Sequence, residues 1–176
     1  GGGVVSTQSQ INTTNLIALH EYHQAATKAS HVISVDTDLD QLRAAVTHEN
    51  GASKNTHILH LAARVVRALG GARVTCCKSG KDRTAMSVTW EQAAWASSLD
   101  QMLQTENDDD DKSDKDVLVL ANLMREFGVR LDVAHKNVGH KRYSFNALQR
   151  KLLPPMYRPP VSTIQDMVTS VALRDS

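Results

Sequence analysis

The segment Cys77–Thr84, with the sequence Cys-Lys-Ser-Gly-Lys-Asp-Arg-Thr, restricts the possible folds of this chain more than any other feature. Its cysteine and arginine are separated by five residues, so both side chains can face one ligand only if the backbone turns tightly. The flanking residues predict an amphipathic helix over residues 58–69, a Gly-Gly pair, a short buried strand over residues 72–76 and a helix from residue 84. A turn that enters a helix N-terminus directs backbone N–H groups and the positive end of the helix dipole toward a bound anion.

This order of elements predicts an α/β fold of the cysteine-dependent phosphatase-like class, with a small central, mostly parallel sheet flanked by helices. One domain is expected for 176 residues. Residues 1–12 are predicted to form a flexible N-terminal segment, residues 13–165 the cysteine-based phosphatase catalytic domain, and residues 166–176 a C-terminal tail. Residues 105–116 are predicted to be an acidic surface insertion, because residues 106–116 hold seven acids and two lysines. Further elements are predicted as helices over residues 14–28, 38–47, 84–104, 114–127 and 144–152, and as a β-prone run over residues 31–35.

The outer residues of the loop carry the predicted chemistry. Cys77 is the predicted nucleophile, because a thiolate attacks phosphorus and the N-terminus of the following helix favours the charged form. Arg83 is the predicted phosphate clamp, since its planar guanidinium binds two oxygens at once and stabilises the charge of the transition state. Thr84 is predicted to help the thiolate leave in the hydrolysis step. Cys76 is expected to point the other way from the strand and to pack in the core.

The inner residues of the loop, Lys78, Ser79, Gly80 and Lys81, are predicted to bind substrate. Gly80 permits a backbone conformation with positive φ, which a tight turn requires. The two lysines add more charge than a single phosphate needs. They therefore indicate a substrate that carries more than one phosphate.

The sequence leaves open which group protonates the leaving oxygen. Asp82 lies within the loop and is the preferred candidate, although its neighbour Arg83 also suits it as a simple ion-pair partner. The alternative is an acid from another loop, supplied by Asp36, Asp38 or Asp40.

The charge, cysteine and histidine content narrows the class of ligand, the compartment and the cofactors that the sequence predicts. Outside the acidic run the chain has 18 basic and 12 acidic residues, which suits an anionic ligand or a membrane surface as well as an ordinary solvated surface. The only two cysteines are adjacent, so no disulfide framework is expected and a reducing compartment fits. The eight histidines are scattered, without the spacing of metal ligands. We expect no metal, no cofactor and no nucleic-acid partner.

Two separate parts of the chain resemble the type I and type II inositol polyphosphate 4-phosphatases. The first is Cys77–Thr84 together with the residues that follow it, 85–89 and 91–92. The second comprises Lys136–Gly139, Tyr143–Gln149 and Tyr157–Pro160. The resemblance covers residues 54–160 and is more specific than the loop alone, because it joins two distant stretches.

The resemblance implies removal of the 4-phosphate from phosphatidylinositol 3,4-bisphosphate to give phosphatidylinositol 3-phosphate, with similar action on soluble inositol polyphosphates. It implies a cysteinyl-phosphate intermediate and no metal cofactor. It also implies a cytoplasmic protein that is peripheral on endosomal or plasma membranes. Carried over by position, Cys77 is the nucleophile, Arg83 the phosphate clamp, and Lys78 and Lys81 the inositol-phosphate contacts. Asp82 matches the loop aspartate that is a proposed acid in related lipid phosphatases.

Two other functions fit the same residues. A protein tyrosine or dual-specificity phosphatase would use the same cysteine and arginine, but it has no need for two loop lysines. A non-catalytic phosphoinositide-binding module would use the basic loop without turnover. Turnover of a phosphotyrosine peptide against an inositol lipid separates the two enzymes, and lipid binding without phosphate release would identify the module.

Overall fold

The computed structural model describes residues 7–29, 35–48, 55–103 and 110–165. The chain divides into two compact units, Gly1–Val74 and Thr75–Ser176, here called the N-terminal and C-terminal units. The division lies inside the predicted catalytic domain of residues 13–165, and the predicted domain boundaries stay predictions. No helix within the described stretches is long and apolar enough to cross a membrane.

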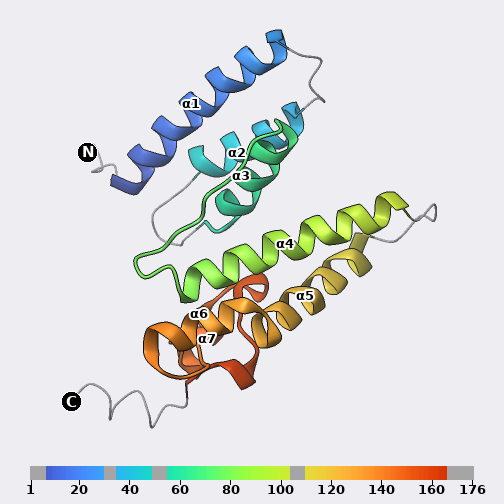
Figure 1. The fold of residues 1–176 in the computed structure, drawn as a ribbon. Coiled ribbons are helices and arrows are strands. Elements are labelled where there is room, and N and C mark those ends of the chain that lie inside the picture. Colours follow the sequence, from blue (N-terminus) through green and yellow to red (C-terminus); the bar gives the residue numbers. More distant parts are fainter. Residues whose placement is uncertain (1–6, 30–34, 49–54, 104–109, 166–176) are drawn as a thin grey trace. The chain divides into compact units, whose positions relative to one another are not determined.

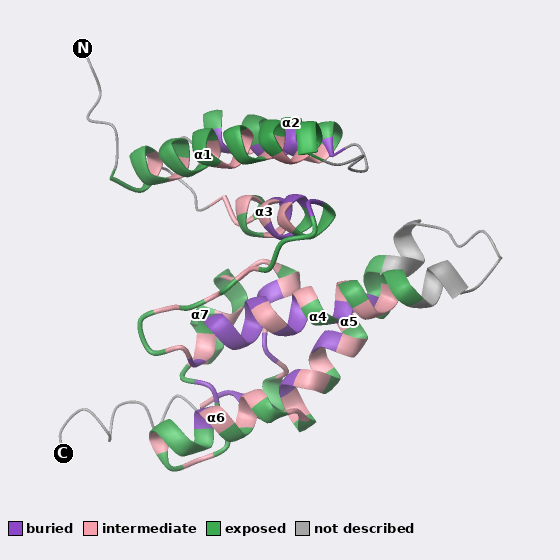
Figure 2. Cartoon of the chain, turned by 45° about the horizontal axis from the view of Figure 1, so that its top comes forward, coloured by how far each residue is buried: buried purple, intermediate pink, exposed green. Residues whose placement is uncertain are grey.

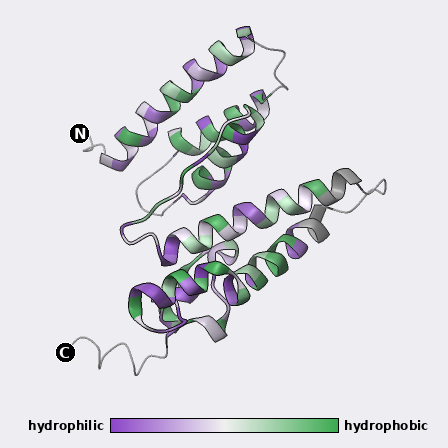
Figure 3. Ribbon diagram, viewed as in Figure 1, coloured by the Kyte–Doolittle hydropathy of each residue, from purple (hydrophilic) through white to green (hydrophobic). Residues whose placement is uncertain are grey.

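The N-terminal unit contains the helices α1 (Thr7–Ala29), α2 (Asp36–Thr47) and α3 (His57–Ala68). Its core is aliphatic and lies between α2 and α3, and Leu16 and Leu19 of α1 pack against it. The buried core residues are Val35, Leu39, Leu42, Val46, Leu61, Val65 and Leu69. Hydrophilic and hydrophobic residues are interspersed along α1 (Figure 3), and none of its residues is buried. The apolar stripe of α3 therefore supplies more of this core than the longer helix α1 does.

The C-terminal unit is built around two long helices, α4 (Asp82–Leu103) and α5 (Asp110–Phe127), which run side by side in opposite directions (Figure 1). Shorter elements complete it: α6 (Val129–Val138), α7 (Ala147–Leu152) and the 3₁₀ turns η1 (Pro155–Tyr157) and η2 (Val161–Thr163). The buried face of α4 is visible in Figure 2. Ala93 of α4 and Ala121 of α5 are fully buried, and such small side chains let two helices approach closely.

A fully buried arginine joins the parts of the C-terminal unit. The Arg125 side chain on α5 is fully buried, and its five N–H groups all have neutral oxygen acceptors. The acceptors are Thr89 Oγ1 (2.9 Å), Asn122 Oδ1 (3.0 Å), Arg158 O (3.1 Å), Met86 O (3.0 Å) and Met156 O (2.6 Å). Burial lowers the pKa of Arg125 to about 10, which leaves it charged at neutral pH. Arg125 thus connects α4, α5 and the proline-rich segment after α7.

The predicted α/β fold with a central parallel sheet is wrong, because the described residues form helices and no strand. The predicted strand over residues 72–76 has no regular secondary structure, and Val74 is 93% exposed. The β-propensity of such a run has effect only where a neighbouring strand and a packed face receive it. The core is instead supplied by helices. One isolated parallel bridge joins Tyr143 to Ile164.

The predicted helices over residues 58–69, 38–47 and 84–104 are confirmed, with shifts of one or two residues at their ends. α1 begins at Thr7, so residues 7–12 of the predicted N-terminal segment are helical. α5 begins at Asp110, inside the predicted acidic insertion of residues 105–116. Residues 31–34 of the β-prone run and residues 105–109 lie outside the described residues.

Candidate active site

The predicted phosphatase loop is a tight turn that leads directly into α4. The Gly80 N–H donates to Cys77 O at 3.2 Å, and Lys81 O accepts from Ala85 N at 3.0 Å in the first turn of the helix. Gly80 has a φ of +64°, the positive value expected from the sequence. The N-terminal turn of α4 is hydrophilic (Figure 3). The loop therefore has the backbone arrangement that an anion requires, although no strand precedes it.

Cys77 lies where its thiolate is stabilised. Partial burial raises the pKa of Cys77, but hydrogen bonds to its sulfur outweigh that effect and lower the pKa from the ordinary 9.0 to about 6. The donors are the Thr84 hydroxyl and the backbone N–H groups of Thr84, Ser79 and Gly80. In addition, the Cys77 N–H donates to Thr84 Oγ1 at 2.9 Å. At neutral pH most of this cysteine is thiolate, the form that acts as a nucleophile.

Replacing Thr84 with alanine should raise the pKa of Cys77 back toward 9.0, because the thiolate loses its hydroxyl donor. The measurement is the rate of Cys77 alkylation by iodoacetamide as a function of pH, in a Cys76→Ser background. The unaltered loop should show a midpoint of about 6. Thr84→Ser keeps the hydroxyl and is the matched control, with a midpoint close to that of the unaltered loop. A midpoint unchanged in Thr84→Ala would show that the hydroxyl does not stabilise the thiolate.

Lys81 and Asp82 are both held by a residue far away in the sequence. Lys81 Nζ donates to Ser144 Oγ at 2.7 Å and lies 3.6 Å from Asp82 Oδ2. The Ser144 N–H donates to Asp82 Oδ1 at 2.8 Å. Lys81 is buried, only 8% exposed, so it is not the free solvent-exposed cation that a loop lysine would usually be. Both oxygens of Asp82 face partners, and its role as the general acid stays a prediction.

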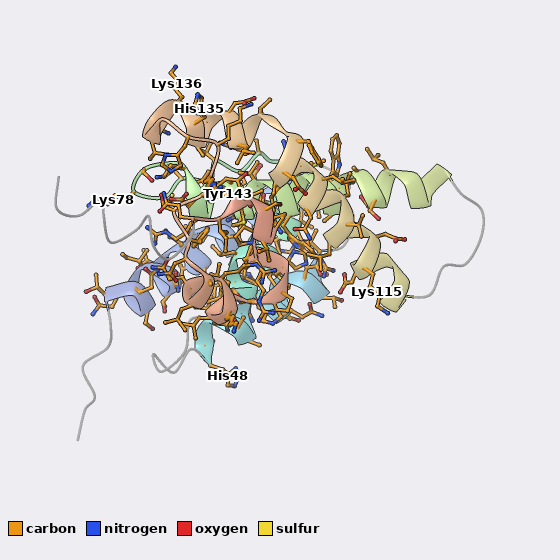
Figure 4. The ribbon with its side chains drawn as sticks, turned by 90° about the horizontal axis from the view of Figure 1, so that it is seen from below. His48, Lys78, Lys115, His135, Lys136 and Tyr143 are labelled. Carbon is orange, nitrogen blue, oxygen red and sulfur yellow. The ribbon has the colours of Figure 1, made fainter. Side chains whose placement is uncertain are left out.

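Lys78, Ser79 and Arg83 are exposed around the turn. Lys78 extends away from the ribbon in Figure 4, whereas Tyr143 lies among other side chains in the interior of the unit. Cys76 is exposed and does not pack in a core as expected. The structure thus brings Cys77, Thr84 and the turn backbone together and leaves the guanidinium of Arg83 accessible to a ligand.

The alternative acids lie on a different unit from the loop. Asp36, Asp38 and Asp40 are all in the first turns of α2, in the N-terminal unit. Asp38 is paired with Arg64 of α3 at 2.5 Å, and Asp36 lies 3.8 Å from His23. Among the residues with described side chains, no three His, Cys, Asp or Glu groups gather as a metal site would need. What the loop offers is a thiolate, a guanidinium and a helix N-terminus, the groups that phosphoryl transfer to a cysteine uses.

Two residues that organise this region are not predicted from the sequence. Ser144 holds the loop, and the Arg125 side chain holds the backbone at Met156 and Arg158. Both depend on contacts across more than 30 residues. The Tyr-Ser-Phe-Asn stretch belongs to the second region of resemblance, and that is the signal which points to it. A lone arginine in a helix gives no such signal.

The chain belongs to the family described as the INPP4A C-terminal domain, whose model matches residues 2–157. Its relatives are named as inositol 4-phosphatases. It is 36% identical over 169 residues to the human "Inositol polyphosphate 4-phosphatase type II". The aligned region is 92% of this chain and 17% of that protein. It is 37% identical, with the same coverage, to the rat "Type II inositol 3,4-bisphosphate 4-phosphatase". The resemblance read from the sequence is therefore confirmed. The chain spans 17% of the length of these curated relatives, and no solved structure matches it.

Proposed function

We propose that this chain carries the catalytic loop of a phosphoinositide phosphatase, which removes the 4-phosphate from phosphatidylinositol 3,4-bisphosphate to give phosphatidylinositol 3-phosphate. Soluble inositol polyphosphates that bear the same 4-phosphate are further substrates in this proposal. The observation that carries it is the placement of Cys77 in a turn at the N-terminus of α4, where hydrogen bonds lower its pKa to about 6. The names of the relatives supply the substrate class.

The proposed reaction has two steps. In the first, the Cys77 thiolate attacks the phosphorus, a sulfur–phosphorus bond forms, and the bond from phosphorus to the inositol 4-oxygen breaks with its electron pair leaving on that oxygen. A proton from an acid completes the inositol hydroxyl, and we assign that acid to Asp82, with Asp36, Asp38 or Asp40 as the alternative. In the second, water attacks the phosphocysteine, inorganic phosphate leaves, and the thiolate returns with help from the Thr84 hydroxyl.

The other loop residues bind charge in this proposal. Arg83 holds two oxygens of the transferred phosphate, and the backbone of Ser79 and Gly80 provides N–H donors. Lys78, which is exposed, contacts a second phosphate of the same substrate. The lipid substrate requires action at a membrane surface, and we propose a cytoplasmic protein that is peripheral on endosomal or plasma membranes.

The test is phosphate release from vesicles that contain phosphatidylinositol 3,4-bisphosphate, measured in EDTA with the full-length product of the gene. We expect release with phosphatidylinositol 3-phosphate as the remaining lipid, and turnover of a phosphotyrosine peptide at least about a hundredfold slower, because the extra loop charge then has no partner. Arg83→Met, which keeps the length of the side chain and loses the guanidinium, is the inactive control.

Each other outcome contradicts a different part of the proposal. Faster turnover of the peptide would favour a protein phosphatase. Vesicle binding without release would favour a binding module. Activity that EDTA abolishes and a divalent ion restores would overturn the metal-free mechanism.

A further inference from the structure

Residues 143–145 are held in place by contacts with parts of the unit other than the catalytic loop. Tyr143 is fully buried, its N–H donates to Thr163 O at 2.7 Å, and its hydroxyl donates to Arg125 O at 2.9 Å. Phe145 O accepts from Gln165 N at 3.2 Å. Burial raises the pKa of Tyr143 to about 12, so the hydroxyl remains a donor throughout the neutral range. Ser144, between these two residues, therefore has little freedom to move.

Ser144 in turn makes two hydrogen bonds to neighbouring residues of the loop. Its hydroxyl accepts from Lys81 Nζ at 2.7 Å, and its N–H donates to Asp82 Oδ1 at 2.8 Å. Lys81 and Asp82 stand between Gly80, whose N–H donates to Cys77 O, and Thr84, whose hydroxyl accepts from the Cys77 N–H. Because the backbone is continuous, holding Lys81 and Asp82 also restricts the positions of Gly80 and Thr84.

We propose that Ser144 is a positioning residue for the catalytic loop, which through Lys81 and Asp82 keeps the turn in the conformation that directs its N–H groups at Cys77. The charged groups that face Ser144 are Lys81 and Asp82. The charge of Arg130 acts to lower the pKa of the neighbouring Tyr143. The effect of Ser144 on turnover rests on the proposed function. Its effect on the thiol is independent of any substrate.

The partners of the Lys81 ammonium group support this assignment. An ammonium group has three N–H donors. Ser144 takes one at 2.7 Å, and the Asp82 carboxylate, at 3.6 Å, holds the ammonium on the same side by charge attraction. Lys81 is thereby better suited to hold the loop than to act as a freely mobile phosphate contact, and Lys78 is the lysine that remains exposed.

The test removes the Ser144 hydroxyl and measures alkylation of Cys77 against pH in the full-length product of the gene, with Cys76 replaced by serine. We expect Ser144→Ala to shift the midpoint upward by about one pKa unit, which makes alkylation at pH 6 about fivefold slower. Ser144→Thr keeps the hydroxyl and should restore the midpoint. Ser162→Ala is the matched control, since the Ser162 hydroxyl also makes a hydrogen bond to a charged side chain within the same unit, here as the donor to Glu126.

A double-mutant cycle separates positioning from general destabilisation. In a Lys81→Met background, Ser144→Ala should have no further effect on the alkylation midpoint, because the contact is already lost. If Ser144→Ala reduces the helical circular dichroism, the alkylation midpoint of Lys81→Met is measured instead, because that variant removes the same hydrogen bond from the loop.

An unchanged midpoint in Ser144→Ala, a failure of threonine to restore it, or an additive effect in the Lys81→Met background would overturn the proposal. Alkylation needs no substrate, so these results do not depend on turnover. A shifted midpoint in a protein that releases no phosphate from any inositol lipid would keep the role of Ser144 and reject the proposed function.

Discussion

Replacing Arg125 with leucine is expected to lower the free energy of unfolding of the C-terminal unit by at least about 3 kcal/mol, enough to unfold a marginal unit. The substitution leaves five buried or partly buried oxygen acceptors without their donor, three of them backbone carbonyls from Met86, Met156 and Arg158. Each unsatisfied buried polar group costs about 1–3 kcal/mol, and leucine does not fill the volume of the guanidinium.

Tryptophan fluorescence gives a direct reading of this loss. The only two tryptophans, Trp90 and Trp95, both lie on α4, so their emission during urea unfolding reports on the C-terminal unit alone. Lys136→Leu is the control: it removes the same charge from an exposed position on α6 and should leave the urea midpoint nearly unchanged (Figure 4). Equal midpoints for Arg125→Leu and Lys136→Leu would mean that the buried hydrogen bonds of Arg125 contribute no net stability.

Replacing Cys77 with serine is expected to reduce phosphate release at least about a thousandfold while leaving ligand binding intact. With a pKa of about 6, the thiol is mostly ionised at neutral pH, whereas a serine hydroxyl in the same place is almost entirely protonated. The substitution exchanges sulfur for oxygen and keeps the partly buried position, so the turn and its N–H donors should persist.

The adjacent cysteine provides the matched control for this experiment. Cys76 is exposed, and serine in its place should leave release from phosphatidylinositol 3,4-bisphosphate unchanged. Binding is measured by sedimentation with vesicles of the same lipid. Residual turnover above one tenth in Cys77→Ser, or loss in Cys76→Ser comparable to that in Cys77→Ser, would remove Cys77 from the proposed nucleophilic role.

The parts of the fold that could be predicted are those coded by local patterns. The stripe of apolar residues on α3 specifies a helix by its spacing, and the Gly-Gly pair after it marks the end, where Gly70 has a φ of +71°. The loop from Cys77 is likewise local, because its donors, the Thr84 hydroxyl and backbone N–H groups, all lie within seven residues of Cys77. A reader of the sequence can therefore propose the nucleophile and the turn without knowing the fold.

The parts that could not be predicted depend on what packs against a segment. Residues 72–76 have the composition of a buried strand, but the sequence does not say whether a neighbouring strand exists, and Val74 is exposed. Ser144 and Arg125 act across 62 and 39 residues, through Asp82 and Met86 respectively. No spacing rule connects residues so far apart. The sequence thus predicts the local turn of the loop more reliably than the architecture that holds it.

The hydrogen bonds of the last described residues bear on where an expressed fragment of this protein should end. The family match stops at residue 157, but Arg158 O accepts from Arg125, Thr163 O from the Tyr143 N–H, and Gln165 N donates to Phe145 O. A fragment trimmed to the family match would remove all three groups and release the segment that carries Ser144. Loss of activity in such a fragment would then result from where the fragment ends. Expressed fragments should therefore keep the chain through residue 165.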